Sequence, residues 1–306
     1  VDPTGQYVIN FNGAIYNYLE LSKTLESKGI TFQSKCDTEV LLEAYKVWGL
    51  DCLSKLNGMF AFAIYDKKLG KIFCARDRFG EKPFLFSLSE DYFVFASEYK
   101  ALFCLSEIDI NIDEIRLLRF LDQPKQGLDT SHKTIFGNIF QLMPAEYMII
   151  EVASMEVTRK SYWDVEPSEE IGQLNDKDAS EHFRLLIEDS VRLRMRSDVP
   201  VGSALSGGLD SSSIVALNRK ILGEGVAYPT FTGVFPGTSS DESQYAEIVR
   251  DRFDLIGHTV KPKAHQLIEV FDAFVWFNEL PVGSASQYAQ WCIFQKAKLE
   301  GIAQAM

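Results

Sequence analysis

The feature that most constrains the fold is an apolar segment that runs into a glycine turn and then into a helical pattern. Ser206-Gly207-Gly208 follows this segment, and Leu209–Ser212 opens the helix. From here apolar segments and helical patterns alternate. The expected strands are Val201–Leu205, Thr230–Phe235 and His258–Lys261, and the expected helices are Asp210–Ile221, Ser243–Phe253, His265–Asn278 and Ser284–Glu300. Such alternation predicts a parallel, doubly wound sheet with ligands at the carboxyl ends of its strands.

The turn has the residue types of an anion-binding loop. Its two glycines let the backbone approach an anion closely, and the free N–H groups and dipole of the following helix favour negative charge. The hydroxyls of Ser206, Ser211 and Ser212 add hydrogen-bond donors. No Lys follows the glycines, so the loop is not the P-loop of kinases and GTPases.

Asp210 narrows the chemistry of this loop. A lone carboxylate at the start of a helix would repel phosphate, but it fits the site if it holds Mg²⁺ on the pyrophosphate of ATP. The pattern therefore favours a reaction that splits ATP between the α- and β-phosphates and releases AMP and pyrophosphate. The alternative is an ordinary strand–turn–helix with a serine cap.

The first half of the chain is rich in short strands instead. Both faces of Phe60–Tyr65 are apolar, so we expect this strand to be covered on both sides. The turn from Asp66 to Gly70 indicates antiparallel pairing, and the whole predicts a sandwich of sheets flanked by helices. The expected strands are Gln6–Phe11, Met59–Tyr65, Lys71–Ala75, Phe84–Leu88 and Tyr92–Ala96, with helices at Tyr18–Lys28 and Thr38–Trp48.

A polar segment without periodicity separates the two halves. We predict a linker over residues 164–178, between one domain at 1–163 and another at 179–306. Asp178 and Glu181 are spaced like a capping pair for the helix that follows. In that helix Phe183, Ile187, Val191 and Met195 form a stripe that we expect to pack in the core.

Composition excludes several classes of function. The formal net charge is −12 and no run of Lys or Arg occurs, which argues against nucleic acid and anionic membranes as partners. Five scattered cysteines without a CxxC pair argue against a disulfide framework or a zinc site and favour the cytoplasm. No apolar stretch reaches the length of a membrane span. The chain opens on Val1 and stops at Met306, where a strand is expected, so we expect an inactive fragment that lacks both termini.

The second half resembles a known family at several points. The string SGGLDSS at Ser206–Ser212 is similar to the pyrophosphate loop of the PP-loop ATP pyrophosphatase synthetases, and most of all to that of glutamine-dependent asparagine synthetases. Phe231–Gly237 and the acidic Asp241-Glu242 resemble further segments of that domain, although an ordinary buried strand explains the first equally well. The resemblance implies an adenine-nucleotide site formed by Leu205, Ser206, Gly207, Gly208, Asp210, Ser211, Ser212 and Gly233, with ATP bound and Asp210 holding Mg²⁺.

The first half resembles the class II glutamine amidotransferase domain of the same family. The matching segments are Phe11–Asn17, Ser34–Glu39, Asn57–Asp66 and Ala75–Pro83. The resemblance implies an αββα sandwich of mostly antiparallel sheets, of the N-terminal-nucleophile type. In such domains an N-terminal cysteine hydrolyses the glutamine amide through a thioester.

Three residues are carried over as candidates for this glutamine site. By resemblance the side chain of Asn12 and the backbone N–H of Gly13 stabilise the oxyanion, and Asp37 pairs with the α-amino group of glutamine. The alternatives are an Asn-Gly turn and a helix cap at Asp37. For Arg76-Asp77-Arg78 we favour structural pairing over catalysis.

The sequence departs from the family pattern in three places. The N-terminal cysteine and the Arg-bearing loop are not present, and Ala14 stands where the family usually has Glu. Cys36 is expected to be a small buried side chain rather than a nucleophile.

The resemblance implies the ATP-dependent amidation of aspartate through β-aspartyl-AMP, with ammonia from glutamine. Its partners would be the small molecules glutamine, aspartate and ATP, and a homodimer is compatible with it. One alternative is the same machinery acting on another carboxylate, such as a sugar acid, a peptide or a cyclising β-amino acid. The other is an inactive glutaminase-fold binding module.

Overall fold

The computed structural model describes residues 1–128, 130–223, 225–238, 241–302 and 304–305. The chain divides into two compact units, Val1–Pro167 and Ser168–Met306. Each unit is considered by itself below.

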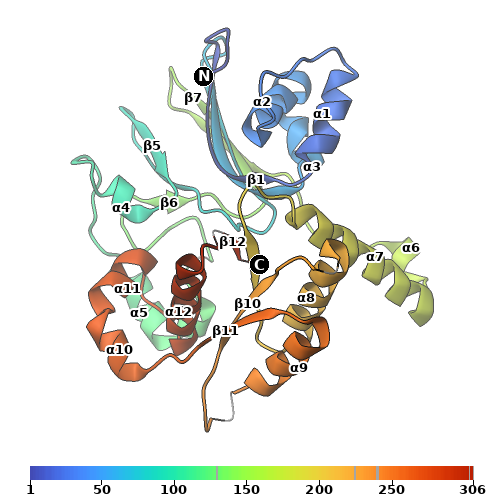
Figure 1. Ribbon diagram of the computed structural model, residues 1–306. Coiled ribbons are helices and arrows are strands. Elements are labelled where there is room, and N and C mark those ends of the chain that lie inside the picture. The colour runs from blue at the N-terminus through green and yellow to red at the C-terminus, as the bar shows by residue number, and fades with distance from the viewer. Residues whose placement is uncertain (129, 224, 239–240, 303, 306) are drawn as a thin grey trace. The chain divides into compact units, whose positions relative to one another are not determined.

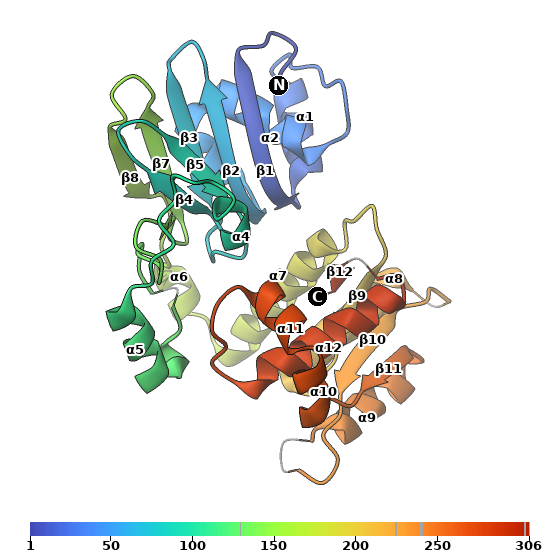
Figure 2. The ribbon, with the colours of Figure 1, turned by 90° about the vertical axis from the view of Figure 1, so that its left-hand side faces the viewer.

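Unit 1 contains two antiparallel sheets (Figure 2). The first has five strands in the order β1-β2-β3-β7-β8, and the second has three in the order β5-β4-β6. This confirms the prediction of mostly antiparallel pairing. The strands are β1 (Tyr7–Ile15), β2 (Gly58–Asp66), β3 (Lys71–Arg76), β4 (Leu85–Leu88), β5 (Phe93–Ala96), β6 (Phe140–Gln141), β7 (Glu146–Glu151) and β8 (Val157–Ser161).

Strand β2 lies at the centre of unit 1 because both of its faces are apolar. Phe60, Phe62 and Ile64 belong to the core that the helices α1, α2 and α3 form with the first sheet. Ala61 and Ala63 face the other way and pack with residues of the second sheet, as the sequence predicts. The helices are α1 (Tyr18–Glu26), α2 (Asp37–Trp48), η1 (Gly49–Asp51) and α3 (Cys52–Lys55), followed later by α4 (Tyr99–Leu102), α5 (Glu114–Asp122) and η2 (Pro124–Gln126).

Unit 2 contains a four-stranded parallel sheet in the order β11-β10-β9-β12 (Figure 1). The helices α8 and α9 lie on one side of this sheet and α12 on the other, so the predicted doubly wound parallel sheet is confirmed. The strand order reverses between β9 and β12, and ligands of such sheets bind at the carboxyl ends beside a reversal. The elements are β9 (Val201–Ala204), α8 (Leu209–Leu222), β10 (Pro229–Gly233), α9 (Ser243–Phe253), β11 (Ile256–Val260), α10 (Ala264–Glu269), α11 (Phe271–Asn278), α12 (Ala285–Leu299) and β12 (Gln304–Ala305).

Helix α7 differs from its prediction. Residues 164–178 contain the short helix α6 (Glu169–Gly172) and the first turn of α7 (Asp176–Arg194). The predicted capping pair is wrong, because the side chain of Asn175 accepts the hydrogen bond from the N–H of Asp178 at 3.0 Å and so begins the helix earlier. The prediction that the helix stripe packs in the core is wrong for Phe183, which is 64% exposed, and is confirmed for Val191. The reason is that burial in α7 is confined to its last turns.

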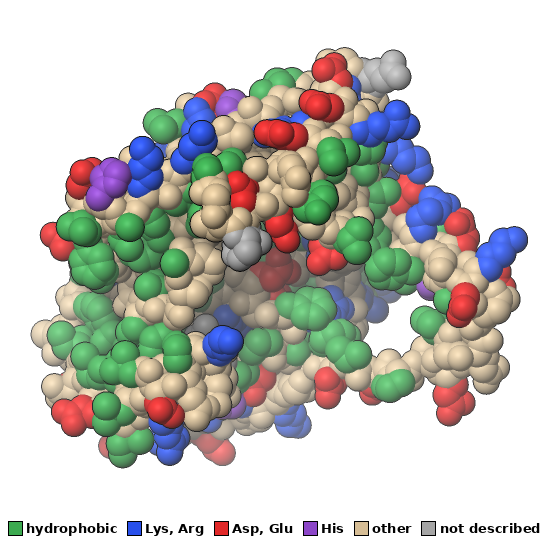
Figure 3. Space-filling model, turned by 90° about the horizontal axis from the view of Figure 1, so that it is seen from below, with side chains coloured by type: hydrophobic (Ala, Val, Ile, Leu, Met, Phe, Trp, Pro, Cys, Tyr) green, Lys and Arg blue, Asp and Glu red, His purple; other side chains and the backbone are tan. Residues whose placement is uncertain are grey.

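One smaller difference concerns the helix that follows β11. The single helix expected at His265–Asn278 is interrupted at Val270, which gives α10 and α11. Exposed large hydrophobic side chains remain on α11, among them Trp276 and Phe277. Figure 3 shows hydrophobic side chains in patches between charges of both signs. None of the helices in the described ranges has the length and apolar character needed to cross a membrane.

Candidate functional site

Asn12 and Gly13 lie near the end of strand β1, opposite Ala61 and Phe60 of β2. They are therefore part of a strand, and the alternative of an Asn-Gly turn is wrong. A Cβ atom on Gly13 would stand 2.1 Å from the carbonyl oxygen of Met59. Only glycine fits this close approach of the two backbones.

The backbone N–H of Gly13 points away from the neighbouring strand β2. Its partner Phe60 uses both polar groups on its other side, since Phe60 N donates to Asp77 Oδ2 at 3.1 Å and Phe60 O accepts from Asp77 N at 2.8 Å. Gly13 and Phe60 are thus a non-hydrogen-bonded pair of the antiparallel ladder. Because β1 is an edge strand, the Gly13 N–H is directed to the open edge.

Asp37 lies on the same open edge of β1. Its Oδ2 accepts a hydrogen bond from the N–H of Ile15 at 2.9 Å. The N–H groups of Ile15 and Gly13 point the same way, because those of alternate residues in a strand do. The two positions are roughly 7 Å apart at the usual rise of a strand. The helix-cap alternative is wrong, because Asp37 is the first residue of α2 and Cys36 holds the cap position without a side-chain bond.

The side chain of Asn12 contacts the second sheet. Its Nδ2 donates to Ser97 Oγ at 2.8 Å, and Ser97 directly follows β5. Both residues line a cavity of about 190 Å³ between the sheets. Its other lining residues are Asn10, Ala61, Phe62, Pro83, Phe84, Phe95 and Ala96. Ser97 is separated from Asn12 by 85 residues, so sequence reasoning missed it.

Glu39 holds the loop that leads to Asp37, and it was also missed. Its carboxylate accepts hydrogen bonds from Gln33 N at 2.8 Å, from Ser34 N at 2.7 Å and from Ser34 Oγ at 2.6 Å. Burial opposes ionisation of Glu39, but these hydrogen bonds outweigh it and lower the pKa of its carboxyl group. Cys36, in the same loop, is exposed, so the expectation of a buried thiol is wrong.

Arg76 and Asp77 both bind backbone groups around the turn after β3. The buried carboxylate of Asp77 accepts from the N–H groups of Phe60, Phe79, Glu81 and Lys82 at 2.9–3.1 Å. Arg76 donates to the carbonyl oxygens of Gly80, Lys82 and Leu142 at 2.7–2.9 Å. Both residues fix the turn after β3, which supports the structural interpretation.

In unit 2 the glycine turn connects β9 to α8 as predicted. Gly207 has a φ of +94°, and a Cβ there would stand 2.8 Å from Ala246 N and from Glu242 O. The turn therefore packs against the start of α9, which brings Asp241–Ala246 next to it. Gly208 is the N-cap of α8, so the first N–H groups of this helix have no partner within it.

The serines of the turn fall into two groups. Ser206 and Ser211 bind each other, with 3.0 Å between their Oγ atoms, and Ser206 Oγ accepts from Gly208 N at 3.2 Å. The hydroxyl of Ser212 is buried and has no hydrogen-bond partner in the part of the chain that the structure describes. A buried hydroxyl without a partner is unfavourable unless a ligand completes it.

Asp210 is exposed in the first turn of α8, beside these serines. Within the described ranges, no three His, Cys, Asp or Glu side chains lie together as a metal site of the protein alone would need. The groups present fit a polyphosphate with a divalent cation. The serine hydroxyls and free N–H groups can donate to phosphate oxygens, and the carboxylate can bind the cation.

Leu205 and Gly233 lie at the carboxyl ends of β9 and β10. Leu205 N donates to Phe231 O at 2.8 Å, and Leu205 O accepts from Thr232 Oγ1 at 2.8 Å. A Cβ on Gly233 would make ordinary contacts, at 3.5 Å with the ring of Phe235. Glycine is therefore not sterically required at position 233.

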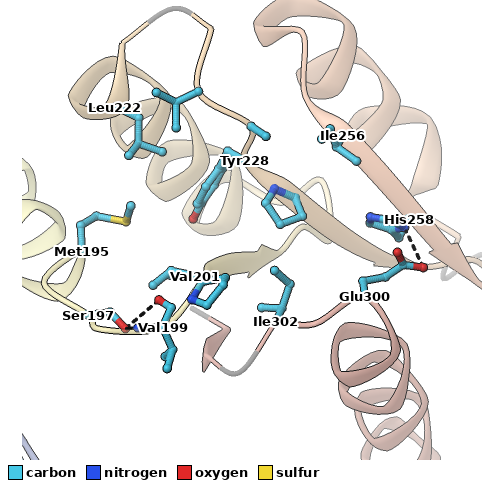
Figure 4. Close-up of a pocket in the computed structure, with 14 residues that line it drawn as sticks. Met195, Ser197, Val199, Val201, Leu222, Tyr228, Ile256, His258, Glu300 and Ile302 are labelled. Carbon is cyan, nitrogen blue, oxygen red and sulfur yellow. Dashed lines mark hydrogen bonds and ion pairs between the residues drawn. The ribbon is translucent and has the colours of Figure 1, made fainter.

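A hydrophobic pocket of about 520 Å³ opens at the other end of the strands of this sheet, away from the serine turn (Figure 4). The residues that begin β9, β10 and β11 line it, namely Val201, Pro229 and Ile256. His258 and Glu300 lie together on its wall, with 3.5 Å between Nδ1 and Oε1. The pocket is at the amino ends of the strands and is separate from the serine turn.

Comparison with known proteins gives two family matches. Residues 1–163 match the glutamine amidotransferase domain, and residues 182–306 match asparagine synthase.

Individual relatives are similar over most of the chain. A Methanocaldococcus jannaschii protein provisionally named asparagine synthetase [glutamine-hydrolyzing] 2 is 36% identical over 95% of this chain and 55% of its own length. Asparagine synthetase [glutamine-hydrolyzing] 3 of Bacillus subtilis is 38% identical over 69% of this chain and 33% of its own length. The chain thus spans about a third to a half of these relatives. A solved Bacillus subtilis glutamine phosphoribosylpyrophosphate amidotransferase is 18% identical, with a TM-score of 0.37 over 85% of this chain and 62% of that one.

Proposed function

This chain belongs to the family of glutamine-hydrolysing asparagine synthetases, and we propose that it contributes the glutamine site and the pyrophosphate loop of an ATP-dependent amide ligase. Unit 1 hydrolyses glutamine to glutamate and ammonia. Unit 2 activates a carboxylate with ATP, and the ammonia then converts it to an amide. The names of the relatives support aspartate as the acceptor and asparagine as the product.

The observation that carries the proposal for unit 1 is the open edge of β1. The Gly13 N–H has no partner in the ladder, and Asp37 is fixed to Ile15 on the same edge. A glutamine molecule extended along this edge would place its α-amino group at Asp37 and its amide carbonyl near Gly13. The N–H of Gly13 and the carboxamide of Asn12 then stabilise the negative oxygen of the tetrahedral intermediate.

The thioester step needs a thiolate nucleophile. We propose that an N-terminal cysteine of the complete encoded protein supplies it. Its α-amino group takes the thiol proton, the sulfur bonds to the amide carbon, and the amide nitrogen receives this proton and leaves as ammonia. Water then cleaves the thioester, which releases glutamate and restores the thiol.

In unit 2 we propose that Ser206–Ser212 binds the pyrophosphate portion of ATP. The aspartate carboxylate attacks the α-phosphorus and pyrophosphate leaves, which gives β-aspartyl-AMP. Ammonia attacks the acyl carbon and AMP leaves with the carboxylate oxygen. Asp210 would hold Mg²⁺ on the pyrophosphate, where the ion would offset negative charge. The hydroxyl of Ser212, which has no hydrogen-bond partner among the residues that the structure describes, supports this use of the turn. We also propose backbone contacts of the nucleotide with Leu205 and Gly233.

The proposal is tested on the complete encoded protein with ATP, Mg²⁺, aspartate and glutamine. We expect AMP, pyrophosphate, asparagine and glutamate in equal amounts. Formation of AMP that does not depend on aspartate, but on another carboxylate, would overturn the choice of acceptor. Formation of ADP in place of AMP would overturn the role of the serine turn.

A further inference from the structure

Ser97 is joined to a residue of the proposed glutamine site from the other sheet of unit 1. The Nδ2 of Asn12, on β1, donates to Ser97 Oγ at 2.8 Å. Ser97 directly follows β5 and is half-buried on the wall of the cavity that both residues line.

In the structure this hydrogen bond holds the Asn12 carboxamide with its nitrogen toward Ser97. The terminal torsion of asparagine is broad and roughly two-fold, so the amide alone has two similar orientations. Its nitrogen carries two hydrogens and its oxygen only accepts. With one N–H donated to Ser97, the second N–H remains for a ligand. In the flipped orientation the oxygen of Asn12 would face a developing oxyanion and repel it.

The apolar surroundings of the cavity strengthen the hydrogen bond between Asn12 and Ser97. Its walls contain the apolar groups of Phe62, Pro83, Phe84 and Phe95, which provide no competing acceptor for the Asn12 amide. Asn10, which also lines the cavity, could offer the Asn12 amide another hydrogen bond, but Asn10 is exposed to solvent. A hydrogen bond in such surroundings is stronger than one in water.

We propose that Ser97 is a positioning residue of the glutaminase site, which holds the Asn12 carboxamide with its free N–H toward the oxyanion. This rests on the proposed glutaminase function. Ser97 acts through Asn12 and makes no contact with substrate.

The test compares variants of the complete encoded protein in glutamine hydrolysis. Ser97→Ala should lower kcat about tenfold with KM changed by less than about twofold, which is a smaller loss than the 10²–10³-fold of removing an oxyanion donor itself. Ser97→Thr keeps the hydroxyl and should restore most of the rate. Ser97→Cys keeps the size but is a weak acceptor, so it should resemble Ser97→Ala.

Two controls separate positioning from a structural role. In an Asn12→Ala background, Ser97→Ala should cause no further loss of kcat, because the group that it orients is gone. Urea unfolding reports the fold of unit 1 and should give the same midpoint in every Ser97 variant, and synthesis from free ammonia, which takes place in unit 2, should stay within twofold of wild type.

The outcomes distinguish the two proposals. A wild-type protein that does not hydrolyse glutamine would overturn the proposed function. An active wild type whose Ser97→Ala and Ser97→Cys variants keep full kcat would overturn the positioning role alone. Equal losses of kcat from Ser97→Ala with and without Asn12 would overturn it as well.

Discussion

The carboxylate of Asp37 accepts a hydrogen bond from the N–H of Ile15 at 2.9 Å, so the first residue of α2 is fastened to the last residue of β1. The same strand end carries Asn12 and Gly13. A loop–helix segment therefore positions a negative charge beside an edge strand whose N–H groups point outward. This arrangement suits a ligand with an amino group at one end and a carbonyl group at the other.

Asp37→Asn should weaken glutamine binding selectively. The carboxamide oxygen can still accept from Ile15, so the strand end keeps its position, while the charge that pairs with an α-amino group is lost. A hydrogen bond between charged groups contributes about 1.5–3 kcal/mol, so KM for glutamine should rise about 10- to 100-fold. Initial rates at varied glutamine measure this. Asp51→Asn, at an exposed position, is the matched control, and an unchanged KM in Asp37→Asn would exclude the amino-group contact.

The Glu39 carboxylate should make unit 1 sensitive to acid. Burial works against its ionisation, yet the hydrogen bonds from Gln33 and Ser34 lower its pKa below the ordinary 4.5. A group with a lowered folded pKa stabilises the fold above its unfolded pKa, and this contribution is lost as pH falls through the folded value. Urea unfolding from pH 7 to pH 3 should therefore show a decline below about pH 4.5 that is shallower in Glu39→Gln. Identical pH profiles for the two proteins would contradict the assignment.

Gly13→Ala should destabilise unit 1. The added Cβ would lie 2.1 Å from Met59 O and 2.8 Å from Phe60 Cα, and backbone atoms cannot move aside without opening the β1–β2 ladder. Overpacking costs about 1–3 kcal/mol, and we expect the upper end, measured by urea unfolding. Gly137→Ala, in the same unit, is the control, because a Cβ there would make only an ordinary contact, at 3.6 Å with Asn111 O. Equal stability of the two variants would show that the strands separate easily.

Sequence patterns and the family resemblance pointed to the parts of each candidate site that are local. Asn12, Gly13 and Asp37 stand in short motifs, and the turn from Ser206 to Ser212 follows from a strand, two glycines and a helix start. Ser97 could not be found this way, because its contact with Asn12 depends on how one sheet packs on the other. Phe183 shows the opposite error: helical spacing predicts a buried face, but spacing does not reveal how far along the helix the packing extends.

Asp210→Asn should abolish the exchange of pyrophosphate with ATP and leave glutaminase activity intact. The carboxylate is exposed at the first turn of α8, so its loss should not disturb the fold, and the amide binds Mg²⁺ much more weakly than a carboxylate does. Asp272→Asn, in the first turn of α11, is the matched control and should retain exchange. Exchange that persists in Asp210→Asn would remove Asp210 from the metal site.

Ser212→Ala should separate ATP binding from stability. The Ser212 hydroxyl is buried without a hydrogen-bond partner among the described residues, so its removal takes no intramolecular bond from the fold and relieves a desolvated polar atom. The thermal midpoint should therefore stay the same or rise slightly. If this hydroxyl donates to a phosphate oxygen, KM for ATP should rise about 10- to 100-fold, as expected for a hydrogen bond to a charged group. Ser213→Ala, on the exposed neighbouring position, should change neither quantity. A lower thermal midpoint in Ser212→Ala with an unaltered KM would mean that the hydroxyl serves the fold and not the nucleotide.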